Sequence, residues 1–409
     1  MYPPPEGTLE TPDQIRELDD TFLTSDPFGY FVARIGMLHA WARFSGGGPG
    51  DESENDATEP QPAQGDHLGG APDVAEDIGR PDLFPIMRAV MRNEGGVAQP
   101  EAMTVSAQVA VDAFALRHHV AEALVRLLVG AAERSLISGM PSTSLWSRLT
   151  DDKNVQISQL LDAVRKAADD LGEFGFARLI VPPSVTIENA ADQSYLGGFA
   201  DLCAEWVERA VELLGPSELD INTAHNKVKH GLAVRGRADL KVPFTTVGPD
   251  ADGNVPVSAF DGDTSFNIFE RPVLEFMSRA KTPGTRRGGG LEVTQLQLDY
   301  RHLLAESMMM SYVHGALFHV AACQHFKGRE VPRGLSVAPH PGLAGQDAAR
   351  PNLAGHQVGL KFPITKPTGG GEARPAGFWH RDGASIEFSH VGKRVSAQVI
   401  DPVEPGDGR

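Results

Sequence analysis

The chain has 409 residues and a formal net charge of −17, so it is acidic and long enough for two or three domains. This charge disfavours bulk binding to DNA, because a protein that coats phosphates needs a basic surface. The first residues lack a basic and apolar leader, and no apolar run reaches the length of a membrane span. We therefore expect a soluble, cytoplasmic protein without a membrane partner.

The N-terminal region, residues 1–45, contains two predicted helices. Thr11 followed by Pro12 is typical of an N-cap and a first helical turn, and an aromatic-rich helix follows at about residues 27–44. Residues 46–80 are predicted to be a disordered linker. From Gly46 to Asp82 there are ten acids and a single base, Arg80, and there is no apolar run able to form a core.

Residues 81–326 are predicted to form a helical bundle. Apolar residues recur at three- and four-residue spacing in the segment 192–214, and other helices are expected at about 81–93, 100–136, 151–171, 217–231 and 291–325. Short β-prone runs predict a small β insertion at about 232–270. Residues 327–409 are expected to form a loop-rich extension with a β-hairpin around Gly392. The predicted fold class is mainly α.

The segment His-Asn-Lys-Val-Lys-His-Gly at residues 225–231 concentrates groups that can move protons and bind anions. Gly231 is a natural left-handed end for the helix. On a helical wheel the segment has an apolar face and an opposite polar ridge. The apolar face is Ile221, Ala224 and Val228 with His225 at its edge, and the ridge is Asn222, Asn226 and His230.

Two interpretations of this segment stay open. An imidazole at His230 beside the ammonium groups of Lys227 and Lys229 would suit a phosphodiester, with the histidine as acid or base and the lysines neutralising charge. In the alternative, the segment is a solvated helix end whose Lys and His side chains satisfy the terminal carbonyls.

Arg117 is the second unusual position, because it falls in the middle of an apolar helical stripe. A buried guanidinium must find an acceptor. One interpretation aims Arg117 at the same cleft as Asn226 and His230, and the other makes it an interhelix ion pair that fixes register. His118 and Glu122, four residues apart, are predicted to pair with each other.

A helix that ends in Asn-Lys-x-Lys-His-Gly and is followed by a short strand resembles the last core helix of HEPN-domain proteins. The helix with Arg117 and Glu122 is similar to the first core helix of several bacterial branches. The resemblance covers about residues 100–326. It implies an up-and-down helical bundle, often a homodimer, and either a metal-independent endoribonuclease, frequently in antiviral systems, or a non-catalytic binder.

In catalytic HEPN proteins an arginine precedes the motif histidine with four to six residues between them, and Thr223, Ala224 and His225 occupy those positions here. The resemblance implies a histidine role for His230 and a polar role for Asn226. It leaves only Lys227, Lys229 or Arg117 for the phosphate, with His225 as a further binding residue.

Three hypotheses follow from this pattern. The chain is a non-catalytic or altered HEPN-like module that binds RNA, a nucleotide or a protein partner. Alternatively it is a metal-independent endoribonuclease with His230 as general base, or a structural protein with no ligand site.

No cofactor and no metal site are expected. Suitable ligand types occur on two predicted helices, but the Glu-x-x-His spacing of bundle metal sites is absent. The two cysteines, Cys203 and Cys323, lie on apolar stripes and are typical of buried thiols rather than of a disulfide framework.

Overall fold

A computed structural model describes the parts of the chain from which the fold is built. The expected linker lies outside the described residues, as do the helices predicted at about 81–93 and, apart from Asp162, at 151–171. The described residues are 10–46, 102–136, 143–150, 162, 175–186, 188–217, 219–231, 234–240, 243–245, 247–248, 250–252, 254, 256–260, 264–267, 269, 271–279, 290–342, 349–351, 358–365, 377–381, 384–391 and 394–400.

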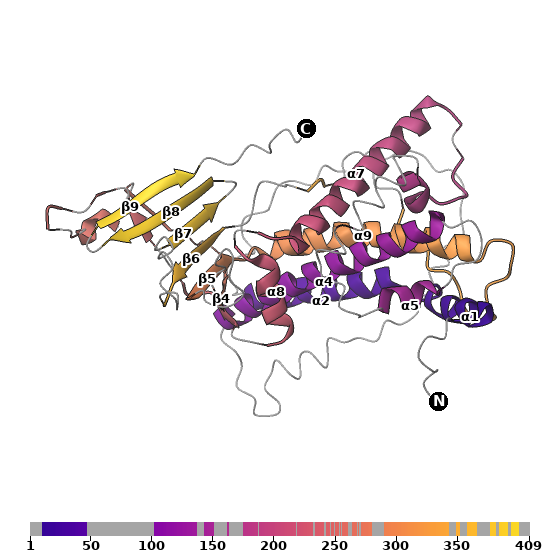
Figure 1. Cartoon of the computed structure of the whole chain (residues 1–409), viewed down its shortest axis with the longest axis horizontal. Coiled ribbons are helices and arrows are strands. Elements are labelled where there is room, and N and C mark those ends of the chain that lie inside the picture. The colour runs from indigo at the N-terminus through magenta and orange to yellow at the C-terminus, as the bar shows by residue number, and fades with distance from the viewer. Residues whose placement is uncertain are drawn as a thin grey trace, which may run out of the picture.

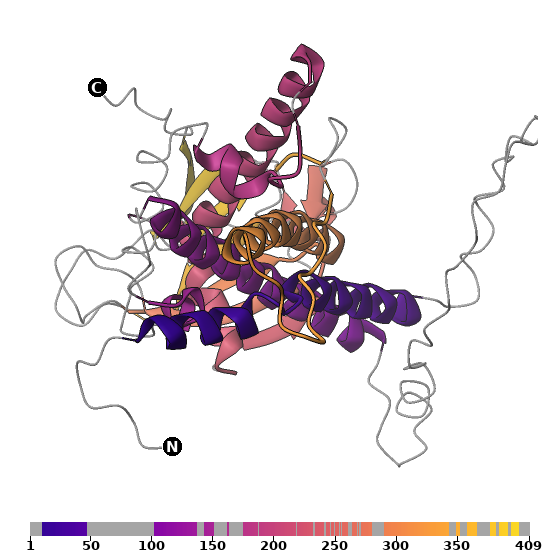
Figure 2. The ribbon, with the colours of Figure 1, turned by 90° about the vertical axis from the view of Figure 1, so that its right-hand side faces the viewer.

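The described part of the fold is mainly α, with a helical bundle at one end and a sheet at the other (Figure 1). Helix α9 runs through the middle of the bundle and contacts α2, α4 and α7, as the end-on view shows (Figure 2). The helices are α1 (Pro12–Phe22), α2 (Pro27–Gly46), α4 (Ala102–Leu136), α5 (Leu145–Thr150), α7 (Ala190–Leu214), α8 (Ile221–Lys229) and α9 (Tyr300–His325).

Local sequence explains where these helices begin. The Thr11 side chain accepts a hydrogen bond from the backbone of Gln14, whose own side chain binds back to Thr11, so α1 begins with a capping box, as its Thr-Pro pair predicts. Asn189 caps α7 through its side-chain oxygen in the same way. Because Gly315 has no Cβ, α9 approaches Phe28 of α2 closely: a Cβ there would lie 3.1 Å from the Phe28 Cβ and Cγ.

The sheet is antiparallel and has the strand order β1-β4-β5-β6-β7-β8-β9. A separate two-stranded sheet pairs β2 with β3, and η1 (Val257–Phe260) is a short 3-10 helix beside it. The strands are β1 (Val234–Arg237), β2 (Pro243–Thr245), β3 (Ser265–Asn267), β4 (Val273–Arg279), β5 (Leu291–Gln297), β6 (Gly359–Pro363), β7 (Gly377–Arg381), β8 (Ala384–Val391) and β9 (Arg394–Ile400).

The sheet is larger than the β insertion expected at about 232–270. Strands from both sides of α9 in the sequence join it, because β5 pairs with β4 on one side and with β6 on the other. The predicted C-terminal hairpin is confirmed as β8 and β9, but it forms the outer part of this sheet rather than a separate element. The bundle and the C-terminal region therefore share one sheet.

The helix predicted at about residues 291–325 is wrong in its first part, which is strand β5. Alternation along Leu291-Glu-Val-Thr-Gln-Leu and the β-branched Val293 and Thr294 favour a strand. The side chain of Asp299 then accepts hydrogen bonds from the backbone N–H groups of Arg301 and His302, so α9 begins at Tyr300.

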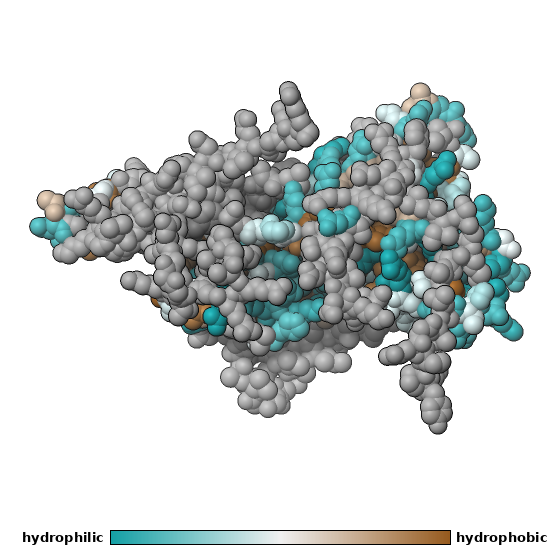
Figure 3. All heavy atoms as spheres, in the orientation of Figure 1, coloured by the Kyte–Doolittle hydropathy of each residue, from teal (hydrophilic) through white to brown (hydrophobic). Residues whose placement is uncertain are grey.

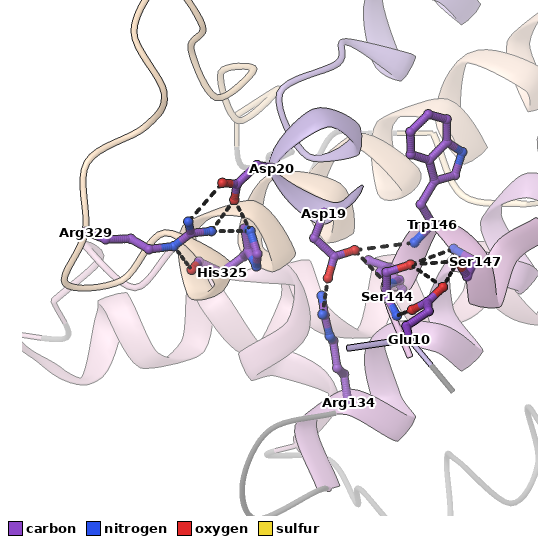
Figure 4. A network of polar contacts seen from close by, with 10 residues as sticks. Glu10, Asp19, Asp20, Arg134, Ser144, Trp146, Ser147, His325 and Arg329 are labelled. Carbon is purple, nitrogen blue, oxygen red and sulfur yellow. Dashed lines mark hydrogen bonds and ion pairs between the residues drawn. The ribbon is translucent and has the colours of Figure 1, made fainter. Parts of the chain in front are cut away.

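A polar network at the end of the bundle distant from the sheet joins α1 to its neighbours (Figure 4). Asp19 is fully buried, pairs with Arg134 of α4 and accepts a 2.7 Å hydrogen bond from the backbone N–H of Leu145. Asp20 pairs with His325, at 2.7 Å, and with Arg329 beyond the end of α9. These adjacent carboxylates thus attach α1 to three other segments.

Candidate functional site

The motif helix α8 begins under strain and ends as its sequence predicts. Asp220 has a left-handed backbone (φ 53°), and its side chain makes no cap bond to α8 but pairs with Lys361 of β6 at 2.7 Å. Ser217 accepts a hydrogen bond from the Ile221 N–H instead, at 3.0 Å. At the other end His230 is the C-cap, and Gly231 follows with φ 63°. A glycine there avoids the steric cost that a Cβ would meet.

The two faces of α8 follow the helical wheel, with one exception. Asn226 and His230 are exposed, as is Lys229, and Lys227 is partly exposed. Hydrophilic residues gather on the molecular surface where α8 lies (Figure 3). Asn222 is the exception, because its amide donates to the Leu214 carbonyl at 3.1 Å and its oxygen is buried. The exposed ridge is therefore Asn226 and His230, with Lys229 beside them.

The inner face of α8 packs on α4 through a pair of stacked imidazoles. The rings of His118 and His225 lie 4.8 Å apart and 12° from parallel. His118 Nδ1 donates to the Phe114 carbonyl at 3.1 Å, and in the described residues neither His118 Nε2 nor His225 Nδ1 has a hydrogen-bond partner. Burial lowers the pKa of His225 to about 4, and burial and the Arg117 charge hold the pKa of His118 well below its usual value. Both imidazoles are thus neutral at pH 7.

Arg117 does not share a surface with His230. It is 4% exposed and donates to Glu306 of α9 at 2.7 Å, while Arg209 of α7 donates to the other Glu306 oxygen at 2.7 Å. This cluster of Arg117, Arg209 and Glu306 matches the interhelix ion pair that the sequence offered as the alternative to a ligand-binding arginine. The composite cleft of Arg117, Asn226 and His230 is absent, because the guanidinium is buried between helices and the ridge faces outward.

The predicted pair of His118 and Glu122 is wrong as well. Glu122 accepts two hydrogen bonds from Arg126, one turn further along α4, at 3.0 and 2.8 Å. His118 lies on the buried side of α4 and turns to the Phe114 carbonyl and the His225 ring, whereas Glu122 is only partly buried. The four-residue spacing allowed both pairings, and packing against α8 decides between them.

Burial by itself raises the pKa of Glu306, but the charges of Arg117 and Arg209 and the ring of His302, whose Nε2 lies 3.5 Å from the carboxylate, outweigh burial. The result is a pKa well below the usual range, so Glu306 is ionised at any ordinary pH. The carboxylate therefore serves as a permanent counter-charge for the two guanidinium groups rather than as a proton carrier.

A small cavity lies beside this cluster, between α4, α8, β5 and α9. The cavity has a volume of about 20 Å³. Its lining includes Arg117, Ile221, Leu296 and His302. That volume suits about one ordered water. Arg117, which lines the cavity, has no hydrogen-bond partner for its Nε among the described residues. The cavity is too small for a nucleotide.

The structure brings a further group to the same side of the bundle that the sequence did not indicate. Tyr30 and Arg34 of α2 lie beside His119 of α4, and Arg34 donates to His119 Nδ1 at 3.2 Å. The spacing of Tyr30, Arg34 and Met37 at helical intervals was the available signal, because it sets a cation among exposed bulky side chains.

No known protein family, no curated protein and no solved structure matches the chain. Within the described ranges, no group of three or more histidine, cysteine or acidic side chains is placed to hold a metal ion. Among the helices that the structure describes, none has both the length and the apolar character needed to cross a membrane.

Proposed function

We propose that this chain is a HEPN-like helical module that binds RNA through the outer end of α8 and does not hydrolyse it. The observation that carries the proposal is the exposure of Asn226, Lys229 and His230 on the last turns of a helix whose other face is anchored in the bundle. An ammonium, an amide and an imidazole together can neutralise a phosphate and donate to its oxygens. A rigid helix end presents them at fixed spacing.

The position of Arg117 supports binding without cleavage. Cleavage of RNA by a metal-independent route needs a base for the 2′-hydroxyl and a cation for the charge that develops on the phosphate. The guanidinium that could supply this charge is held by Glu306, and no arginine precedes His230 with four to six residues between them. Lys229 offers a point charge without the bidentate geometry of arginine.

The experiment is a binding titration with fluorescently labelled RNA at several salt concentrations, in EDTA. Lys229→Gln and His230→Gln together should weaken binding about tenfold and reduce the salt dependence by about one phosphate contact. Lys327→Gln is the matched control, because Lys327 is an exposed lysine just beyond α9. Wild-type protein that fails to bind RNA, or a double variant that binds like the control, contradicts the proposal.

The same reactions are sampled for RNA fragments. Cleavage that disappears in His230→Gln would replace the proposal with the endoribonuclease hypothesis. Binding without fragments is the expected result.

A further inference from the structure

The surface next to α8 carries an aromatic ring, a guanidinium and an imidazole in mutual contact. Tyr30 is 51% exposed, and its ring centroid lies 5.7 Å from the Arg34 Cζ and 6.4 Å from the His119 ring. Arg34 also donates to the Tyr30 hydroxyl at 3.3 Å. We call Tyr30, Arg34 and His119 the α2 cluster. It orders a flat, exposed aromatic face beside a positive charge.

The guanidinium in the α2 cluster makes no direct ion pair within the described residues. The Asp112 carboxylate of α4 interacts with Arg34 only at longer range and accepts a hydrogen bond from Gln108 at 3.1 Å. The direct partner of Arg34 on α4 is the Nδ1 atom of His119, which accepts its hydrogen bond. Because Nδ1 of His119 accepts, Nε2 carries the ring proton and is a donor. The pKa of His119 is lowered by burial and by the Arg34 charge, so the ring is a neutral donor at pH 7. The cluster thus offers donors and positive charge, the complement of an anion.

The α2 cluster and the α8 ridge belong to elements that both pack on α4. His119 of α4 contacts Tyr30 and Arg34, and His118, the residue before it, stacks on His225 of α8. The Lys229 charge acts on both His119 and His225, in agreement with this arrangement. Glu122 is the acid that also acts on both histidines, and it is already paired with Arg126. Positive charge from α2 and from α8 therefore faces the same stretch of α4.

Resting on the proposed function, we propose that the α2 cluster is the part of the RNA site that holds an unpaired nucleotide. The base stacks on the exposed face of Tyr30, and Arg34 and Lys229 bind the phosphates on either side of it. Aromatic rings interleaved with cations are the means by which proteins hold single strands, since every base has a flat face to stack while paired bases are hidden in the duplex. A protein partner could use the exposed Tyr30 and Met37, and failure of the wild-type protein to bind single-stranded RNA would favour that partner over the inference.

The test separates stacking from charge by using two ligands: a single-stranded RNA and an abasic RNA of the same length, which keeps the phosphates and lacks the bases. Tyr30→Leu should weaken binding of the single-stranded RNA by roughly 5- to 100-fold and leave binding of the abasic RNA unchanged. Tyr30→Phe retains the ring and should bind like wild type. Arg34→Gln should weaken both ligands and lower the salt dependence by about one contact.

Tyr195→Leu serves as the matched control, because Tyr195 is a partly exposed tyrosine on α7. Thermal unfolding of each variant checks the fold. If Tyr30→Leu unfolds, Arg34→Gln decides the test, because binding of both RNAs as tightly as wild type would overturn the inference. Equal binding of single-stranded RNA by Tyr30→Leu and wild type overturns the α2 cluster as a nucleotide site. If Lys229→Gln with His230→Gln still weakens binding about tenfold in that case, the proposed function survives and only this inference fails.

Discussion

Neutralising Glu306 should destabilise the whole bundle. In Glu306→Gln the amide oxygen can still accept from one arginine, but its NH₂ group faces the other guanidinium. The side chain of Glu306 is 1% exposed, and those of Arg117 and Arg209 are 5% and 3% exposed. Arg117 would thus remain buried without a carboxylate, and Arg209 would keep only Glu212, which is half-exposed and lies 3.1 Å away. Removing one partner of such a buried pair costs about 3–5 kcal/mol.

A loss of this size lowers the melting temperature by roughly 6–20 °C, at about 2–4 °C per kcal/mol for a domain of this size. Urea unfolding followed by circular dichroism measures the free energy directly. Glu208→Gln is the matched control, since Glu208 is exposed on α7. A free energy of unfolding for Glu306→Gln within about 1 kcal/mol of that of the control would refute the reasoning, because the loss of a buried counter-charge costs more than this.

The pH dependence checks the same cluster independently. The pKa of Glu306 is depressed in the folded protein, so its contribution is present above the usual glutamate pKa and is lost as the pH falls toward the folded value. Glu306→Gln should therefore lose less stability than wild type between about pH 5 and pH 3. Replacing Arg117, Arg209 and Glu306 together by methionine should restore much of the stability, because no buried charge then lacks a partner.

Three other outcomes are expected. Burial holds the pKa of His225 at about 4, so the unfolded chain binds more protons below about pH 6.5, and stability should fall by up to about 3 kcal/mol as the pH drops from there toward 4. Urea titrations of His225→Phe should give a flatter curve over this window, and an unchanged curve would contradict the assignment. Gly36→Ala has open space around the new Cβ and should raise stability by about 0.5–1 kcal/mol. Gly315→Ala places its Cβ 3.1 Å from Phe28 and should not raise stability. Equal melting temperatures of the two variants would argue against the close contact between α9 and α2. Gly231→Ala places a Cβ at φ 63° and should cost about 1–2 kcal/mol, seen as faster amide exchange at the end of α8; unchanged exchange would contradict the left-handed cap.

Helical periodicity predicted most of the bundle, because one apolar stripe per helix suffices to recognise a helix. Helical periodicity was a wrong guide at residues 291–297, which form strand β5. Alternating apolar residues and β-branched side chains are typical of a strand there, not of the first turns of α9. The helix start at Asp299 was visible in the sequence as an N-cap residue. The extent of the sheet could not be predicted from the sequence. Strands β5 and β6 pair with each other although α9 separates them in the chain, and no local pattern indicates which distant strands pair.

The candidate site was predicted in part for similar reasons. The exposure of Asn226 and His230 follows from the wheel, since their positions oppose the apolar face. The partner of Arg117 could have been sought, because Arg117, Arg209 and Glu306 each interrupt an apolar stripe of their helix, and opposite charges on buried faces must meet. The α2 cluster could not be predicted from the sequence, because it depends on how α2 packs beside α4.

The position of α9 also bears on how the protein is made on the ribosome. Helix α4 packs against α9, yet α9 ends roughly 190 residues after α4 does. At about 5–20 residues per second, synthesis of that interval takes roughly 10–40 s. During this time α4 can pack on α2, which precedes it in the chain, but the face of α4 that receives α9 has no native cover. The nascent chain is therefore expected to need a holding chaperone until Glu306 has emerged.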